Sequence, residues 1–470
     1  DTLRRLHGRK FSFDFETTGL SYIDDEIVGL AVADEKDSWY IARDGLKAMP
    51  ELVSLLQDKD ATAVAHGSKF EYQFLKTKLG VEPTDLAPVW DTQIMHWLHT
   101  SMPGGNDLKS MARKLLGRDV LEFTDVVPDG TLIHDVPLET LGRYAAAGDA
   151  RNTYDLHTLM LKELRGDGLL SVYTDIEMPV TPVLAEMEMS PIRLDLAQAA
   201  KMLEEVTRQA NALERAFRYM GYGDGDITPD RIAKYFYEEL SLPVVRLTKG
   251  EKRGAIDSET LDKIRHLHPQ VQLYLEWKKL VSAQEKFLLP IVEANLEWLR
   301  FGIKQTSTRT GRLSTTPNMQ NWPVKIRSII IAPEGMEVWA RDYNQIEPRI
   351  AAFGAQDPAM MAAYRLPSRN ADGSLNLDAD PYIRLGLDMG FDGQKVLTKD
   401  PTTRRVVKAV FLGWMYGAGG FKMQETCAKE GVHLSIAECG QFKRALEEAR
   451  PQFVQWRVKL VEQARQTGVA

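Results

Sequence analysis

The sequence has little cysteine and no long hydrophobic run. Its two cysteines among 470 residues, Cys427 and Cys439, exclude a disulfide framework and a cysteine-rich zinc module, and they are typical of a reducing compartment. No segment approaches the roughly 18 unbroken apolar residues of a membrane-spanning helix, and the N-terminal residues have no apolar core of the kind that directs secretion. We therefore expect an intracellular protein without membrane contact. Hydrophobic residues (44%) and charged residues (27%) are balanced as in a folded globular chain, whose length predicts about three domains.

Acidic residues are absent from two long stretches, although the net charge of the whole chain is −7. Residues 298–333 contain no Asp or Glu but include Arg300, Lys304, Arg309, Arg312, Lys325 and Arg327. Residues 401–424 are also free of acids and carry Arg404, Arg405, Lys408 and Lys422. A solvated face is the ordinary explanation of a charged run. Cationic stretches of this length favour a surface that binds a polyanion, because phosphate contacts depend on local charge.

The predicted secondary structure changes in character along the chain. Residues 10–165 alternate strand-like and helix-like segments, which predicts an α/β domain. Residues 175–300 are charged, amphipathic and helical in pattern. After residue 300 comes a loop rich in Thr, Ser and Asn, then a predicted strand near 336–342, then helices to the end. We expect boundaries that give the segments 1–170, 171–300, 301–355 and 356–470.

The first candidate site lies in the segment KFSFDFETTGL at residues 10–20. Side chains of a strand alternate between its faces, so Phe11, Phe13 and Phe15 share one face, while Asp14 and Glu16 share the other. Two adjacent carboxylates repel each other and suit a hard cation such as Mg²⁺ or Mn²⁺. A polar edge-strand face would also explain the acids, but not the Thr-Thr-Gly turn that follows.

This segment resembles the first motif of DnaQ-type 3′→5′ exonucleases, which form the proofreading domain of family A (DNA polymerase I type) DNA polymerases. The resemblance implies a mixed sheet of the RNase H-like kind and two-metal hydrolysis. It places the second motif at residues 66–75, with Glu71 as its acid, and the third at residues 142–153, with Tyr144 and Asp149. Asp14, Glu16 and Asp149 would then bind the metal ions, and Glu71 and Tyr144 would complete the catalytic set.

Both later motifs depart from the family pattern. Glu71 stands where Asp is usual, and its extra methylene displaces the carboxylate. Tyr144 lies five residues before Asp149 instead of four, which on an α-helix turns the phenol about 100° away from the carboxylate. A π-bulge or the start of a loop would restore the alignment. We therefore expect the exonuclease fold, with an activity that these two positions alter.

Another motif, TRTGRLSTTPNMQNWP at residues 308–323, supplies two arginines followed by three side-chain amides, which lie between two prolines in a predicted loop. Side-chain amides can donate to the minor-groove acceptors that every base pair presents, so they check pair geometry without reading sequence. The composition alone would fit an ordinary surface loop. The whole string resembles the family A segment that follows the primer–template duplex, which implies DNA binding by Arg312, Asn318, Gln320 and Asn321.

The segment VWARDYNQIEPR at residues 338–349 predicts a strand that ends at Asp342 and then a helix. Asn344 would cap that helix, with Glu347 completing a capping-box-like pair. Pro348 removes an amide in the first turns, where the loss is tolerable.

This string resembles the first palm motif of family A, Asp-Tyr-Ser-Gln-Ile-Glu. The resemblance implies that Asp342 bridges two Mg²⁺ ions and that the backbone carbonyl of Tyr343 contacts one of them. It also implies that Gln345 and Glu347 meet the incoming nucleotide, with Glu347 pressing on the sugar and excluding a 2′-hydroxyl.

The segment RRVVKAVFLGWMYG at residues 404–417 resembles part of a helix. It places Arg404, Lys408, Leu412 and Tyr416 along one helical face, because these residues are spaced four apart in the sequence. It resembles the family A fingers helix. That implies triphosphate contacts by Arg404 and Lys408, of which the lysine could also protonate the pyrophosphate leaving group. Leu412 would pack on sugar and base, and Tyr416 under the template base. Leu412 departs from the usual Phe or Tyr. Tyr at this position is associated with accepting dideoxynucleotides, so we expect strong discrimination against them here.

Together these motifs resemble a family A DNA polymerase over nearly all of residues 10–470. That implies an α/β exonuclease domain followed by a right hand of palm, helical thumb and helical fingers, acting on primer–template DNA and dNTPs with two Mg²⁺ ions per active site or Mn²⁺ as substitute. We expect a monomer in the cytoplasm or associated with a nucleoid, of bacterial, viral or organellar origin; no processivity factor can be named. The family's second palm carboxylate, in a His-Asp-Glu turn, does not occur after Tyr416. We therefore expect the natural chain to continue beyond Ala470. The alternatives are a nuclease whose polymerase half only grips DNA, and a non-catalytic DNA-clamping protein.

Overall fold

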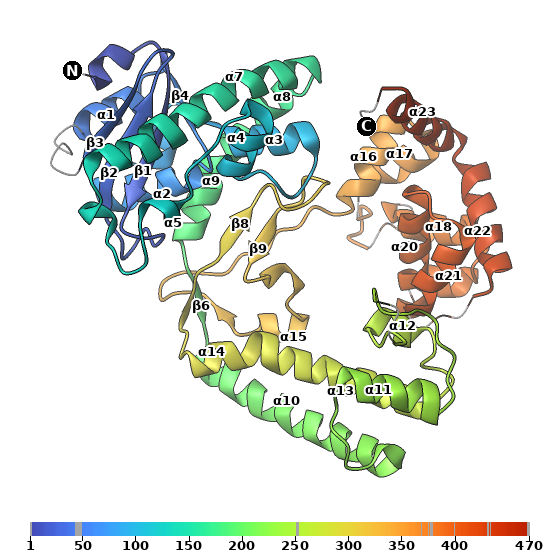
Figure 1. The fold of residues 1–470 in the computed structure, drawn as a ribbon. Helices are drawn as coiled ribbons and strands as arrows, with labels where there is room; N and C mark the ends of the chain where they lie inside the picture. Colours follow the sequence, from blue (N-terminus) through green and yellow to red (C-terminus); the bar gives the residue numbers. More distant parts are fainter. Residues whose placement is uncertain are drawn as a thin grey trace. The chain divides into compact units, whose positions relative to one another are not determined.

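The computed structural model (Figure 1) describes residues 2–42, 49–250, 253–367, 369–374, 376, 379–398, 400–429, 432 and 434–467. By its contacts the chain forms two compact units. Unit 1 comprises Asp1–Glu204 with Ala283–Glu337, and unit 2 comprises Glu205–Ser282 with Val338–Ala470. The four-segment organisation expected from the sequence stays a prediction. Among the described helices none is long and apolar enough to span a membrane.

A five-stranded mixed sheet forms the first part of unit 1. Its order is β3-β2-β1-β4-β5, with β1–β2 and β2–β3 antiparallel and β1–β4 and β4–β5 parallel. The strands are β1 (Lys10–Thr17), β2 (Ile27–Ala33), β3 (Ser38–Ala42), β4 (Thr62–Ala65) and β5 (Trp90–Asp91). The predicted α/β domain with a mixed sheet is therefore confirmed.

Helices cover both faces of this sheet (Figure 1). Phe11, Phe13 and Phe15 enter one buried cluster with residues of α1 (Met49–Leu56) and α2 (Lys69–Leu79). On the other face, β2 packs against the π-helix η5 (Gly142–Ala150). Further helices of this domain are α3 (Thr92–Thr100), α4 (Leu108–Leu116), α7 (Arg151–Gly166) and α9 (Met178–Met189). The aromatic face of β1 is thus committed to the core, which leaves its acidic face for a site.

The rest of unit 1 includes several short strands. A three-stranded sheet has the order β10-β6-β7, and a separate hairpin pairs β8 with β9. These strands are β6 (Ile192–Leu194), β7 (Trp298–Leu299), β8 (Gly302–Lys304), β9 (Ser314–Thr316) and β10 (Ile330–Ile331). Ile303 of β8 donates its backbone N–H to Glu188 Oε1 at 2.5 Å, and its carbonyl accepts from Lys69. Trp97 Nε1 donates to the Thr308 carbonyl at 2.9 Å. The hairpin is therefore held by side chains of the α/β domain.

Unit 2 contains two helical clusters. An aromatic cluster that includes Phe217, Phe236 and Tyr274 joins the end of α10 (Leu196–Phe217) to α11 (Pro229–Lys234) and α13 (Pro269–Ala283). The second cluster surrounds the buried Trp414. Its helices are α16 (Ile346–Ala355), α17 (Pro358–Arg365), α18 (Pro381–Asp388), α20 (Pro401–Met415), α21 (Gly420–Lys429), α22 (Ile436–Ala449) and α23 (Pro451–Thr467).

Two local predictions around residue 342 are wrong. Residues 337–343 are exposed and form no strand, because no described strand lies beside them to complete the backbone hydrogen bonds that a strand requires. Asn344 does not cap the next helix. α16 begins at Ile346, and its N-cap is Gln345 with φ 56° and no side-chain cap bond. The Asn344 carbonyl instead accepts from Arg349 Nε at 2.8 Å. Pro348 is the third residue of α16, where its missing amide costs no helical bond.

Candidate active sites

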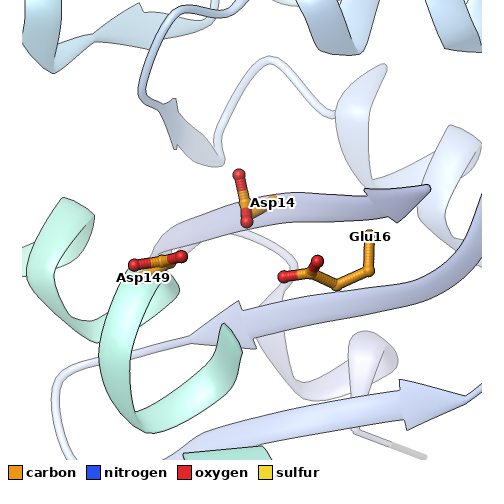
Figure 2. A group of neighbouring side chains, drawn as sticks. All are labelled: Asp14, Glu16 and Asp149. Carbon is orange, nitrogen blue, oxygen red and sulfur yellow. The ribbon is translucent and has the colours of Figure 1, made fainter. Parts of the chain in front are cut away.

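Three carboxylates meet beside the central strand of the mixed sheet. Asp14 and Glu16 come from β1, and Asp149 comes from η5. One ligand oxygen from each lies within 4.8 Å of the others, and Figure 2 shows the three groups gathered in one place. Glu16 and Asp149 are only 6% and 5% exposed, while Asp14 is half-buried. The predicted acidic face of the strand is therefore present, and η5 adds the third acid to it.

The electrostatics of this cluster favour a bound cation. Burial, followed by the charge of Asp149, raises the pKa of Asp14 to about 7. Burial and the neighbouring acids raise the pKa of Glu16 well above its usual value, and burial raises that of Asp149. Carboxylates this close are ionised together only when positive charge stands among them. Hard oxygen donors without thiolate or imidazole suit Mg²⁺ or Mn²⁺. The donor set therefore fits the divalent metal that the sequence predicts.

The π-helix η5 aligns Tyr144 with Asp149 despite their five-residue spacing. In η5 the backbone bonds run from residue i to i+5, so residues five apart lie nearly above one another. The Tyr144 phenol hydrogen-bonds to the Asp149 carboxylate, which helps to lower the pKa of that acid against the effect of its burial. The π-bulge that the sequence offered as one way to restore this alignment is confirmed.

Glu71 stands apart from the three carboxylates. It lies in the first turn of α2 and is 2% exposed, and its Oε2 has no hydrogen-bond partner. Burial raises the pKa of Glu71 well above its usual value, and the charge of Asp14 raises it further. Glu71 does not belong to the group whose ligand atoms lie within 4.8 Å of one another. The structure thus brings Glu71 under the influence of Asp14 without making it a fourth member of the cluster.

Lys109 also belongs to this site, although the sequence did not predict it. It lies on α4, forms an ion pair with Asp149, and holds its Nζ 4.2 Å from the centre of the Tyr144 ring. The sequence offers no signal for this placement, because Lys109 is one of three cations on a short helix and only the tertiary fold aims it at η5.

The four residues predicted to bind DNA lie in unit 1, on the segment that contains β9. Arg312, Asn318, Gln320 and Asn321 are all exposed. Gln320 Nε2 donates to the Leu313 carbonyl at 3.0 Å, which bends the segment back on itself. The adjacent Trp322 is 4% exposed and anchors the end of the loop. The four predicted DNA-binding side chains therefore project from a segment that these contacts hold in place.

The residues predicted to bind nucleotide lie in unit 2. Arg404, Lys408 and Leu412 share the more exposed side of α20, and the exposed Tyr416 directly follows the helix. The opposite side of α20 is buried around Trp414. The predicted helical stripe is thus present, with its last member at the helix end.

Arg404 is already engaged within the unit. It pairs with Asp380 at 2.7 Å, and its guanidinium lies 5.2 Å from the centre of the Tyr382 ring. Burial raises the pKa of Tyr382; the charge of Arg404 opposes that rise, and the charges of Asp380 and Glu347 add to it. Arg404 of α20 and Glu347 of α16 therefore approach the same tyrosine.

Asp342 and its neighbours are less organised. Asp342 and Tyr343 are exposed, and the Asp342 carboxylate makes no hydrogen bond or ion pair with any residue that the structure describes. Gln345 Oε1 accepts from the Tyr364 hydroxyl at 3.1 Å. In the described part of the chain, no group of three metal-ligating side chains forms around Asp342.

Comparisons with known proteins show which families the two parts of the chain resemble. Residues 196–470 match the family described as DNA polymerase family A, and residues 1–165 match the family described as 3′-5′ exonuclease. DNA polymerase I of Bacillus caldotenax is 27% identical over 471 residues, which cover 95% of this chain and 50% of the relative. DNA polymerase I of Treponema pallidum is 28% identical, with 89% of this chain and 41% of the relative covered. The chain thus spans about half the length of the curated relatives it matches.

A solved structure confirms the predicted fold. It is described as the POL domain of Pol1 from M. smegmatis in complex with DNA primer-template and dNTP. The match has a TM-score of 0.75 and 22% sequence identity, and it covers 98% of this chain and 76% of that chain. An α/β exonuclease domain followed by a polymerase hand is therefore the architecture of this chain.

Proposed function

This chain belongs to DNA polymerase family A, and we propose that it extends a DNA primer from dNTPs along a template and removes nucleotides from DNA 3′ ends. The observation that carries the exonuclease half is the cluster of Asp14, Glu16 and Asp149. The polymerase half is supported by the family match together with the exposed residues of α20 and of the segment that contains β9.

In the exonuclease, Asp14, Glu16 and Asp149 would hold divalent ions. Such ions lower the pKa of bound water and stabilise a departing 3′ oxygen. The chain's own contribution is to fix the carboxylates, since β1 presents two of them and the π-helix aligns the third with Tyr144. The Tyr144 phenol would hold Asp149 in a single orientation through its hydrogen bond.

In the polymerase, Asp342 and the Tyr343 carbonyl would hold the ions, because hard oxygen atoms at an exposed position fit Mg²⁺. Arg404 and Lys408 would bind the triphosphate. Arg404 would then exchange its contact with Asp380 for phosphate, while Lys408 needs no such exchange among the described residues. Positive charge placed at the phosphates stabilises the charge that develops during in-line attack by the primer 3′-OH.

Primer–template DNA would be held in part by the segment that contains β9. Arg312 would contact the backbone, and the amides of Asn318, Gln320 and Asn321 would meet minor-groove acceptors, which do not depend on sequence. Glu347, Leu412 and Tyr416 would shape the pocket for the incoming sugar, base and template base. We further propose that the protein works as a monomer. We also propose that it acts within a bacterial cell, since the relatives named above are bacterial DNA polymerases I.

The test uses a 5′-labelled primer annealed to a template, the full-length protein and Mg²⁺. We expect the label to shorten without dNTPs and to lengthen with them, and chelation by EDTA to stop both reactions. Shortening alone, even with dNTPs, would favour a nuclease that only grips DNA. Retention of the duplex without either reaction would favour a non-catalytic clamp, and either result would reject the proposed polymerase.

A further inference from the structure

The Lys109 ammonium pairs with Asp149, one of the three carboxylates of the exonuclease cluster. Asp107 caps the start of α4 through the Ser110 N–H at 2.8 Å, which fixes the first turn that carries Lys109. From there its side chain, 16% exposed, reaches Asp149 and lies over the Tyr144 ring. The ammonium is therefore held by a carboxylate and by an aromatic face at once, and both belong to η5.

The charge of Lys109 acts on the whole cluster. It lowers the pKa of Asp14, of Glu16 and of Asp149, against the effect of their burial in each case. Its neighbour on the same helix behaves differently, because Arg113 pairs with Glu122 at the surface. Lys109 thus supplies positive charge where the carboxylates need it.

We propose that Lys109 is a built-in counter-ion that competes with a divalent metal ion for Asp149 and so sets the metal affinity of the exonuclease site. This inference rests on the proposed exonuclease function, which gives the cluster its metal. The oxygen of Asp149 that faces the ammonium can serve one cation fully, so the metal must displace Lys109 or share the carboxylate with it. The Tyr144 ring gives the displaced ammonium a second place to bind, which keeps the exchange local.

The measurement is Mn²⁺ binding to the full chain without DNA, followed by the electron paramagnetic resonance signal of free Mn²⁺. All variants carry Asp342→Asn, so that the polymerase half contributes equally. Lys109→Met removes the charge, and we expect Mn²⁺ to bind at least about tenfold more tightly. Lys109→Gln removes the charge but keeps a donor for Asp149, and we expect a similar gain. Lys109→Arg keeps the charge and is expected to remain near the parent.

The matched control is Lys114→Met, which removes an exposed cation from the same helix and is expected to leave the affinity unchanged. Equal or weaker Mn²⁺ binding in both Lys109→Met and Lys109→Gln would overturn the role of Lys109. The parallel variant Asp14→Asn distinguishes a failure of the proposed metal site from a failure of the role proposed for Lys109. If Asp14→Asn leaves Mn²⁺ binding unchanged, the metal site of the proposed exonuclease is wrong; if it weakens binding while the neutral Lys109 variants bind as the parent does, only the inference about Lys109 fails.

Discussion

The exonuclease cluster and the polymerase residues are prepared for their ligands to different degrees. Asp14, Glu16 and Asp149 are brought within 4.8 Å by one strand and one helix of a single domain core. The polymerase residues are spread over both compact units, and most of them are exposed, with Asp342 outside any regular element. The fold of one domain therefore assembles the carboxylate cluster by itself. The proposed nucleotide transfer would instead depend on exposed residues that DNA and dNTP must order, and this ordering would be a cost of binding.

The largest expected effect comes from removing the polymerase carboxylate. We expect Asp342→Ala to lower primer extension at least about 10³-fold, because a metal ligand aligned with the reacting phosphate is lost. Digestion of a labelled single strand should stay within twofold. Glu337→Ala is the matched control, since it removes an exposed carboxylate from the same segment. Equal loss in the two variants would show that charge on this segment, and not Asp342, matters.

The converse variant tests the preassembled site. We expect Asp14→Ala to lower Mg²⁺-dependent digestion of a 5′-labelled strand about 10²- to 10³-fold, because two buried acids cannot hold the metal as three do. Primer extension should be preserved. Asp60→Ala changes an exposed aspartate of the same domain and should have no effect. Digestion at the rate of the unchanged protein would remove the catalytic role of the cluster.

A smaller effect concerns the choice of nucleotide on α20. Leu412 has no hydroxyl to substitute for a missing 3′-OH, so we expect dTTP to be strongly preferred over ddTTP. Leu412→Tyr should reduce that preference by at least about tenfold, because a hydrogen bond then compensates for the missing group. Leu412→Phe supplies the same ring without the hydroxyl and serves as the control. Equal use of ddTTP and dTTP by the unchanged protein would contradict this account.

The smallest effect is on stability and is specific to the exonuclease domain. Burial, together with the charges of Lys10 and Arg165, lowers the pKa of His157 to about 3. The unfolded chain binds a proton near pH 6.5 while the folded protein does not, so the stability contributed by the neutral ring is present above pH 6.5 and is lost as the pH falls toward 3.

The test of His157 is denaturant unfolding at pH 7 and pH 4, compared between proteins. His157→Phe should remove up to roughly 3 kcal/mol of the loss in unfolding free energy that acid causes. His134→Phe, at an exposed histidine, should not. An identical pH dependence in His157→Phe and the unchanged protein would show that His157 does not titrate as described.

Much of the exonuclease site could be predicted because its signals are local. Alternation along β1 places Asp14 and Glu16 on one face whatever the tertiary fold. Whether Tyr144 and Asp149 are aligned depends only on the helix type of this segment, and the segment is a π-helix. Lys109 could not be found in this way, because its contact with Asp149 joins residues 40 apart in the chain.

The failures near residue 342 have another physical cause. A sequence pattern gives the preference of a segment for the extended state, but a strand also needs a neighbour for its backbone bonds. Residues 337–343 have no such neighbour among the described strands. Asn344 is a good cap by composition, yet the αL conformation of Gln345 moves the helix start past it. Both errors concern backbone partners, which composition does not encode.

The attachment of the β8–β9 hairpin has a further consequence. Glu188 and Lys69 hydrogen-bond to the backbone of Ile303, and Trp97 to the carbonyl of Thr308, so the segment that carries Arg312 to Asn321 is anchored to the α/β domain. On the proposed function, a duplex lying on this segment would be held in a fixed position relative to the exonuclease domain, and a change at Glu188 would alter the accuracy with which that domain removes mispaired primer ends.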